Sequence, residues 1–349
     1  MELAGADGIL LGGGLALGAA FGALAQRSRF CLVAAVANWR LMRDSRQLAA
    51  WLAALATAIA LTQALELSGV VAVSESSYRG ARLDWLGAAA GGLLFGVGAM
   101  LAGGCAGRTV VNAAEGSGGS LLALVVFALA AALTQYGPLD APRLAVVNAT
   151  AVQLGASDAG IAAVTGLPAW AVAIALAVAA AATAVAFARR SDWSMTAVGV
   201  AAGVLVAAGW WVTGSLGRDE FAAARPDSLS YSGPLARAGW LALGGSISAG
   251  LFGLAVLGGT LAGAAGSAIV AGRWRFVPPP RGRRVSLVAG GILMGIGAVL
   301  AGGCNIGHGL TGLAALSVKS FIVVAAIVAG LLAGLAWLER HDSTSAETA

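Results

Sequence analysis

Nine apolar stretches, each long enough to cross a lipid bilayer, recur along the whole chain. They cover residues 8–26, 48–73, 84–103, 120–137, 160–188, 193–213, 236–262, 285–303 and 318–338. Charged residues make up 11% of the sequence, against about 25% in a typical soluble domain. The sequence therefore predicts an all-α polytopic membrane protein with about nine transmembrane helices.

Several shorter apolar pieces separate these stretches. They cover residues 30–38, 105–114, 141–152, 262–272 and 304–314. Pieces of this length cannot span a bilayer, but they suit half-helices that enter and leave it on one side, shielded by the rest of the protein. We expect several short re-entrant helices.

One apolar stretch occurs twice. Residues 91–105 read GGLLFGVGAMLAGGC and residues 290–304 read GGILMGIGAVLAGGC, which are identical at 11 of 15 positions. Such a match indicates an internal repeat and two pseudo-symmetric halves within a single membrane transport domain. The expected parts are half-repeat 1 at about 8–137, connecting helices at 141–213, half-repeat 2 at about 236–338, and a polar tail at 339–349. A weaker echo joins 13–22 to 244–253 and offers no counterpart of Cys31.

Loop arginines predict the orientation. One loop carries Arg40, Arg43 and Arg46, a second carries Arg189 and Arg190, and a third carries five arginines between 273 and 284. Loops rich in arginine stay in the cytoplasm. Nine crossings then place the N-terminus outside and the C-terminus inside, and the two glycine-rich stretches run in opposite directions. Inverted repeats of this kind are typical of transporters.

Each copy of the repeat ends in Gly-Gly-Cys. Gly103, Gly104, Gly302 and Gly303 fall where a span ends and a short helix begins. Glycines allow a sharp turn there, and we expect them to leave backbone N–H groups uncovered. The N-terminus of the following helix adds partial positive charge. Together these features predict an anion site.

Three cysteines mark the breaks: Cys31, Cys105 and Cys304. They lie far apart in sequence and lack metal-ligand spacing, so neither a disulfide framework nor a metal site is expected. A lone membrane cysteine is often only a small buried apolar residue. Equivalent positions at two repeated breaks favour function instead. A row of neutral, polarisable thiols suits a soft, sulfur-bearing anion and binds it weakly enough to release it.

Three polar residues follow these cysteines closely. Arg108 is either a functional intramembrane charge or a side chain that snorkels to the interface or pairs with Glu115. His308 either contacts substrate or bridges buried helices. Asn305 can bond either the backbone or the substrate.

These motifs resemble the YeeE/YedE family of membrane proteins, which is linked to the transport of sulfur compounds. The matching pieces are SRFCLVAAV at 28–36, AGGCAGRTVVNAAEG at 102–116, WWVTGSLG at 210–217 and AGGCNIGHGLTGLAALS at 301–317. The resemblance implies thiosulfate uptake along Cys31, Cys105 and Cys304, with a small cytoplasmic TusA-like sulfur carrier as partner. Some members serve selenium or other sulfur species, and this chain has His308 where the family commonly has Gln and Asn38 where an acidic residue is frequent.

The expected function is uptake of a small sulfur oxyanion, most consistent with thiosulfate, across the cytoplasmic membrane. A net charge of +5 located in short loops indicates topology rather than nucleic-acid binding. No cofactor or metal and no catalytic residue is expected. Two alternatives stay open: a membrane sulfur-transfer protein that carries a persulfide on one cysteine, and a soft-metal exporter, which the lack of paired Cys or Met ligands disfavours.

Overall fold

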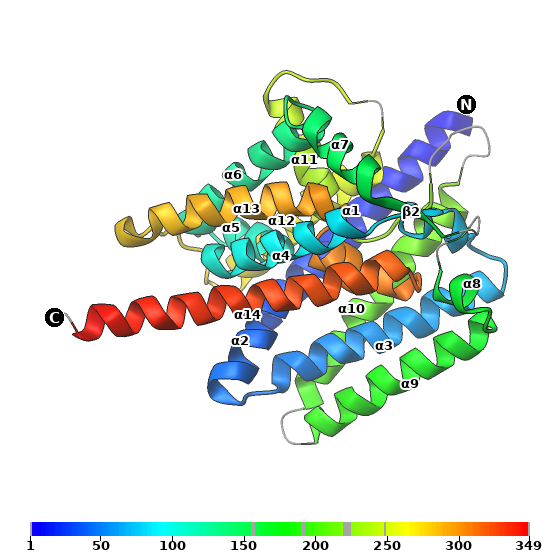
Figure 1. Ribbon diagram of the computed structural model, residues 1–349, viewed down its shortest axis with the longest axis horizontal. Helices are drawn as coiled ribbons and strands as arrows, with labels where there is room; N and C mark the ends of the chain where they lie inside the picture. The colour runs from blue at the N-terminus through cyan, green and yellow to red at the C-terminus, as the bar shows by residue number, and fades with distance from the viewer. Residues whose placement is uncertain are drawn as a thin grey trace.

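The computed structural model describes residues 2–154, 158, 160–189, 193–218, 225–247 and 249–347. Within them, nine helices are long and apolar enough to cross a membrane, which confirms the predicted all-α polytopic class. The N-terminus and the C-terminus lie at opposite ends of the molecule (Figure 1). The arginine-rich connections from α2 to α3 and from α12 to α13 lie at the end that holds the C-terminus (Figure 1).

The chain forms an N-terminal and a C-terminal set of helices joined by three others. The first set is α1 (Glu2–Ser28), α2 (Leu32–Met42), α3 (Arg46–Leu67), α4 (Trp85–Ala102), α5 (Ala106–Ala114) and α6 (Gly118–Gln135). The joining helices are α7 (Asp140–Thr150), α8 (Ile161–Thr165) and α9 (Ala169–Ala188). The last set is α10 (Trp193–Trp211), α11 (Ser232–Ala242), α12 (Leu251–Val270), α13 (Arg284–Ala301), a helix over 305–314, and α14 (Val318–Glu347).

Short elements complete the connections. Two antiparallel strands, β1 (Arg82–Asp84) and β2 (Ala151–Gln153), pair Arg82 with Gln153. Single 3₁₀ turns lie at Val73–Glu75 (η1), Ser77–Arg79 (η2) and Arg281–Arg283 (η4). Two π-helical turns lie at Val212–Leu216 (η3), continuing α10, and at Gly307–Gly312 (η5), inside the 305–314 helix.

The two glycine-rich helices, α4 and α13, pack on each other at the centre of the molecule (Figure 1). Gly98 lies against Gly290 and Met294, whereas Gly91 lies against Gly297 and Ala301, so the helices run antiparallel. A Cβ on Gly98 would lie 2.7 Å from the Met294 backbone nitrogen. Small residues bring the backbones this close and stabilise the pair by van der Waals contact, since lipid offers no hydrophobic driving force. The antiparallel crossing is the arrangement that inverted repeats predict.

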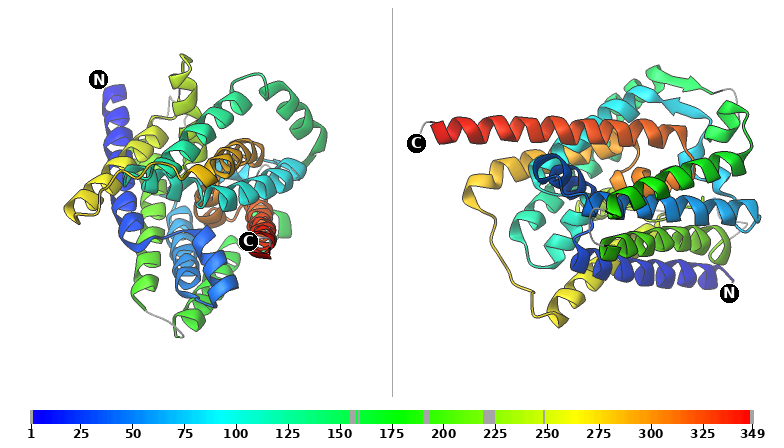
Figure 2. Two further views of the ribbon diagram at one scale, coloured as in Figure 1. Left: turned by 90° about the vertical axis from the view of Figure 1, so that its left-hand side faces the viewer. Right: turned by 90° about the horizontal axis from the view of Figure 1, so that it is seen from below.

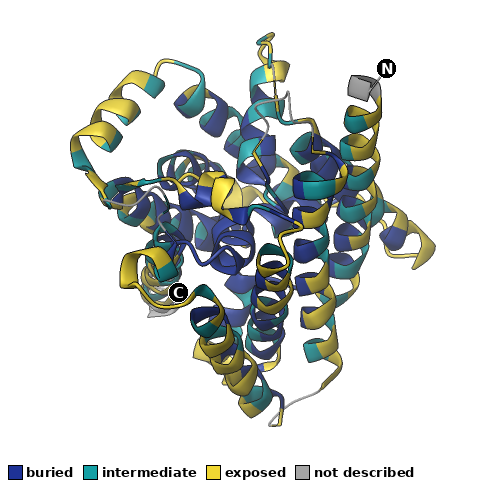
Figure 3. Ribbon diagram, turned by 90° about the vertical axis from the view of Figure 1, so that its right-hand side faces the viewer, coloured by how far each residue is buried: buried dark blue, intermediate teal, exposed yellow. Residues whose placement is uncertain are grey.

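Around this crossing, helices of the N-terminal set pack on helices of the C-terminal set. α4 also packs on α14 while α13 packs on α6, and α1 packs on α12 while α3 packs on α10 (Figure 2). The buried residues gather along these contacts, and exposed residues cover the periphery (Figure 3). Trp170, Ile174 and Val178 of α9 are each more than half exposed, as expected of a surface that faces lipid chains.

Four expectations about the elements were wrong. The stretch 236–262 is not one span, because α11 ends at Ala242 and α12 begins at Leu251, and Gly244 and Gly250 between them adopt positive φ. Nor is 160–188 one span, because α8 ends at Thr165, the following Gly166 also adopts positive φ, and α9 begins only at Ala169. The piece 262–272 is the end of α12 rather than a separate half-helix. The piece 141–152 forms most of α7, which has no buried residues and so lies on the surface. Glycine-rich apolar sequence conceals such breaks, since hydropathy is the same on both sides.

Candidate functional site

Each of the three cysteines lies at the start of a short helix. Cys31 is the N-cap of α2 and Cys105 the N-cap of α5, and Cys304 directly precedes the 305–314 helix. In every case the cysteine carbonyl accepts the first helical hydrogen bond, from Ala35, Thr109 and His308 at 3.0, 2.8 and 2.8 Å. The amides of a first helical turn have no partner within their helix, so each break offers N–H groups and positive dipole charge to an anion.

The three thiols are buried together. The Sγ atoms of Cys31 and Cys105 lie 3.8 Å apart, and all three cysteines are at most 4% exposed. All three are free thiols, and the distance between the Cys31 and Cys105 sulfurs is well above the about 2.05 Å of a disulfide bond. Cys304 lies within electrostatic range of Cys105, and its Sγ accepts a hydrogen bond from the Gly307 amide at 3.5 Å. The structure therefore brings together thiols that the sequence separates by up to 273 residues.

The Gly-Gly pairs make the turns that were predicted for them. Gly103 and Gly302 end α4 and α13 with φ of 77° and 79°, a conformation that favours glycine. The expectation that their amides are uncovered was wrong. The amides of Gly104 and Gly303 donate to the carbonyls of Ala99 and Ala298, and those of Gly103 and Gly302 also bond back to their own helices. These glycines shape the break. Beyond Cys304 the Gly307 amide donates to the cysteine Sγ, so only the amides that precede it in the first turn lack a partner within the helix.

Arg108 connects α5 to two neighbours. Its guanidinium donates to the Ala25 carbonyl at 2.9 Å and lies 4.0 Å from the Glu115 carboxylate. The side chain is 10% exposed, so its charge is largely removed from solvent one turn beyond Cys105. The ion pair that the sequence suggested is therefore present, and the charge still lies beside the thiols of Cys31 and Cys105.

His308 and Asn305 differ in how their side chains are satisfied. A neutral imidazole has one donor and one acceptor, and His308 uses both: Nε2 donates to the Ala301 carbonyl at 3.1 Å and Nδ1 accepts from Ser320 at 2.8 Å. His308 is thus a bridge between α13 and α14. Asn305 is 1% exposed, and neither atom of its amide has a hydrogen-bond partner among the described residues. A buried amide without partners is costly and is common where a ligand binds.

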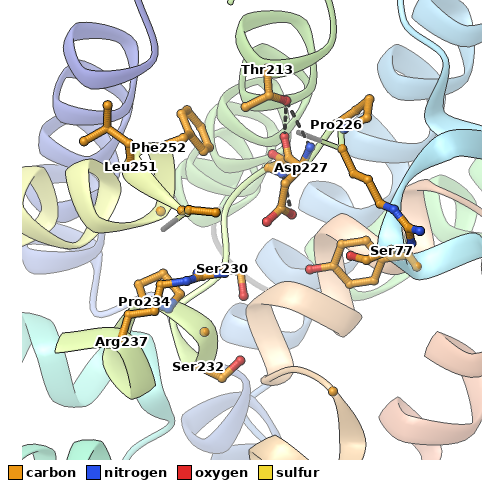
Figure 4. A pocket seen from close by; sticks show the side chains of 18 of the residues that line it. Ser77, Thr213, Pro226, Asp227, Ser230, Ser232, Pro234, Arg237, Leu251 and Phe252 are labelled. Carbon is orange, nitrogen blue, oxygen red and sulfur yellow. Dashed lines mark hydrogen bonds between the residues drawn. The ribbon is translucent and has the colours of Figure 1, made fainter. Parts of the chain in front are cut away.

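A cavity of about 480 Å³ lies between the loops at the N-terminal end and Gly302. Its lining includes four arginines with one acidic residue among them: Arg143, Arg218, Arg225, Arg237 and Asp227. Figure 4 shows Arg237 on α11 and Asp227 and Ser230 on the segment before it. At the inner end, a Cβ on Gly307 would lie 2.9 Å from the Ser230 hydroxyl and 3.1 Å from that of Tyr78. The cavity therefore reaches the helix that begins beside Cys304.

No sequence motif marks the charged residues that line this cavity. Arg143, Arg218 and Arg225 lie between the long apolar stretches, and nothing in their spacing shows that they meet. Asp227 and Arg237 carry no motif. The one available signal was their clustering before and within the short helix α11. Among the described residues, no group of three His, Cys, Asp or Glu side chains could hold a metal ion.

The chain is similar in sequence to known transporters. The chain is 26% identical over 341 residues to the thiosulfate transporter TsuA of Escherichia coli (strain K12), covering 91% of this chain and 92% of that protein. It is 29% identical over 328 residues to the thiosulfate transporter TsuA of Spirochaeta thermophila, covering 88% and 93%. Residues 27–333 match the family described as sulphur transport. With a family match over most of its length and an apolar helical fold, this chain belongs to the sulphur transport family of membrane proteins.

Proposed function

We propose that this protein carries thiosulfate inward across the cytoplasmic membrane, passing it along the thiols of Cys304, Cys105 and Cys31. The observation that carries the proposal is the convergence of three buried thiols at the N-termini of short helices. The two curated relatives, named thiosulfate transporters, support this choice among sulfur anions. The protein acts as a conduit and not as an enzyme.

The arginine-rich loops give the direction. They lie at the C-terminal end of the molecule, and the positive-inside rule places that end in the cytoplasm. The arginine-lined cavity then opens outside, where it collects anions. The path runs from this cavity past Gly302 to Cys304, then to the Cys105–Cys31 pair, and leaves near Arg108 toward the cytoplasm.

Thiols suit this task because of their charge and softness. An unperturbed thiol is neutral at pH 7, so it adds no negative charge to a path for anions. Its S–H group is a weak donor, and its polarisable sulfur matches the terminal sulfur of thiosulfate. Weak, successive sites allow the anion to leave each of them, as conduction requires. The first-turn amides and the Asn305 side chain supply the stronger bonds to its oxygens.

The experiment is thiosulfate uptake into proteoliposomes that contain only this protein. We expect uptake by the wild type and its loss in Cys304→Ala and Cys105→Ala. A matched control is Thr134→Ala, which shortens another buried side chain on α6, where its hydroxyl bonds only its own helix. Full uptake by both cysteine variants contradicts the relay. A stable persulfide on one cysteine after exposure, seen by mass spectrometry, favours the sulfur-transfer alternative.

A cytoplasmic TusA-like carrier is the partner that the family resemblance implies. The arginine-rich end is where it would receive sulfur, because the path leaves there. If uptake by the wild type appears only when a purified carrier is enclosed in the vesicles, the carrier is an obligatory acceptor. Uptake by the wild type alone shows that it is not.

A further inference from the structure

A fourth short helix begins at the same central point as the three that follow cysteines. Helix α11 follows the long helix α10 and precedes α12, as α2 follows α1 and precedes α3. The packing repeats as well. Gly18 and Gly22 of α1 lie against Val256 and Thr260 of α12, and Gly199 and Gly203 of α10 lie in the same parallel manner against Ala50 and Ala54 of α3.

This correspondence gives Cys31 a counterpart that the sequence echo at 13–22 and 244–253 did not reveal. Cys31 is the N-cap of α2, and Tyr231 is the N-cap of α11. The two are 200 residues apart, and Cys105 and Cys304 are 199 apart. The C-terminal set therefore carries a tyrosine where the N-terminal set carries a thiol.

The Tyr231 ring lies among the N-termini of the short helices. It is fully buried, and a Cβ on Gly107, in the first turn of α5, would lie 3.3 Å from it. The same Cβ would lie 3.5 Å from Ile306, in the first turn of the 305–314 helix. The thiols of Cys304 and Cys105 both lie within electrostatic range of the Tyr231 hydroxyl. Tyr231 thus stands where an anion would pass from Cys304 to Cys105.

The hydroxyl of Tyr231 has no proton left for a substrate. Thr260 Oγ1 donates to the Val256 carbonyl at 2.8 Å, so it can only accept from Tyr231, whose oxygen lies 2.9 Å away. The Phe21 ring, with its centroid 6.0 Å from that of Tyr231, packs on the aromatic ring. The Tyr231 side chain is therefore fixed by Thr260 and Phe21, and it offers no hydrogen-bond donor to an anion.

We propose that Tyr231 determines specificity: its ring narrows the step between Cys304 and Cys105, so that only an anion able to exchange water for thiols passes. The proposal rests on the proposed function. Sulfate has the same charge and a tetrahedral shape, but it lacks the soft terminal sulfur. At a dry constriction it loses its hydration and gains little from the thiols, so it is excluded. Without the ring, water fills the step and sulfate passes with its shell.

The test compares thiosulfate and sulfate uptake by Tyr231→Ala and Tyr231→Phe in proteoliposomes. Tyr231→Ala should raise the ratio of sulfate to thiosulfate uptake by at least about tenfold, since a site for ion discrimination is lost. Tyr231→Phe keeps the ring and should keep the wild-type ratio. A purely structural role would lower both fluxes together and leave their ratio unchanged.

A second variant narrows the passage from the opposite wall. Gly107→Ala adds a methyl group against the Tyr231 ring, and we expect slower thiosulfate uptake with sulfate still excluded. It also serves if Tyr231→Ala does not fold. This proposal alone is overturned if folded Tyr231→Ala keeps the wild-type ratio of sulfate to thiosulfate uptake, or if Gly107→Ala takes up thiosulfate at the wild-type rate. Absence of thiosulfate uptake by the wild type overturns the proposed function first.

Discussion

The two Gly-Gly-Cys breaks share one backbone geometry and differ in the polar and charged side chains around them. Both end a helix with a glycine at φ near 78° and both start a short helix after a buried cysteine. Lys319 lies beside Gly302, where Asp84 pairs with it at 2.7 Å. Arg283 lies beside Gly103, and it occupies the position that corresponds to Asp84, 199 residues earlier.

The residues after the two cysteines differ in the same sense. Asn305 follows Cys304 where Ala106 follows Cys105, and Arg108 stands where the second break has Gly307. The break next to the cavity therefore presents an amide without a hydrogen-bond partner among the described residues, whereas the break next to the arginine-rich end presents Arg108, whose charge pairs with Glu115. The repeat gives both breaks the same backbone, and the residues that follow the two cysteines make them chemically different.

The largest expected effect is on transport through the thiols themselves. If the breaks act in series, Cys304→Ser and Cys105→Ser should each lower thiosulfate uptake by about 100-fold, because a hydroxyl lacks the polarisability of sulfur and, as a stronger donor, holds the anion where a thiol releases it. Uptake rates in proteoliposomes measure this. A loss confined to one variant shows that the two breaks act separately.

Replacing the second glycine of each pair by alanine should destabilise the protein to different degrees at the two breaks. A Cβ on Gly303 would lie 2.6 Å from the His308 ring, which two hydrogen bonds hold in place. A Cβ on Gly104 would lie 3.3 Å from Cγ of Arg108, a flexible side chain. Gly303→Ala should therefore lower the free energy of unfolding by about 1–3 kcal/mol, as overpacking does, and Gly104→Ala should lower it by clearly less. Thermal unfolding in detergent compares them, and equal midpoints would show that His308 yields as easily as Arg108.

The two breaks could be predicted from the sequence, because each has a local cause. A repeated Gly-Gly-Cys after an apolar stretch predicts a sharp turn and a short helix, and both are found at Gly103 and Gly302. The importance of Tyr231 could not be predicted from the sequence, because Tyr231 corresponds to Cys31 only in helix order and packing, and the two residue types differ. The meeting of Asp227 and Arg237 could not be predicted either, since only folding brings these residues into one cavity. The free amides were misassigned because the glycines bond back to their own helices, which depends on backbone geometry that composition does not reveal.

Exchanging the residues after the cysteines tests the difference in polarity. Asn305→Ala copies Ala106 into the second break and removes an amide that has no partner among the described residues, so it should not destabilise the protein. We expect KM for thiosulfate to rise about tenfold, the loss of one hydrogen bond to a charged ligand. The reciprocal Ala106→Asn should leave KM for outside thiosulfate unchanged. An unchanged KM in Asn305→Ala would remove Asn305 from the path.

The smallest expected effect concerns the outer cavity and depends on pH. Burial raises the pKa of Asp227 to about 6, even though a backbone hydrogen bond from Ser228 and the charge of Arg237 favour its ionised form. Burial also raises the pKa of Tyr78, which lines the same cavity, well above its usual value, so its hydroxyl keeps its proton near pH 6.

Asp227 is therefore neutral below pH 6 and negative above it. A negative charge opposes thiosulfate in the cavity by about 1 kcal/mol, taking a dianion at ~8 Å in water. KM should then rise about fivefold as the pH increases through 6. Asp227→Asn removes the titrating carboxyl. KM should therefore stay at its low value throughout pH 5 to 8, the range in which a carboxyl of this pKa titrates. Asp44→Asn at the opposite end is the control, because the hydrogen bond with Arg46 lowers the pKa of Asp44 and no titration near 6 is expected there. A pH profile that persists in Asp227→Asn would show that a group other than Asp227 titrates, and would remove Asp227 from the step that captures thiosulfate.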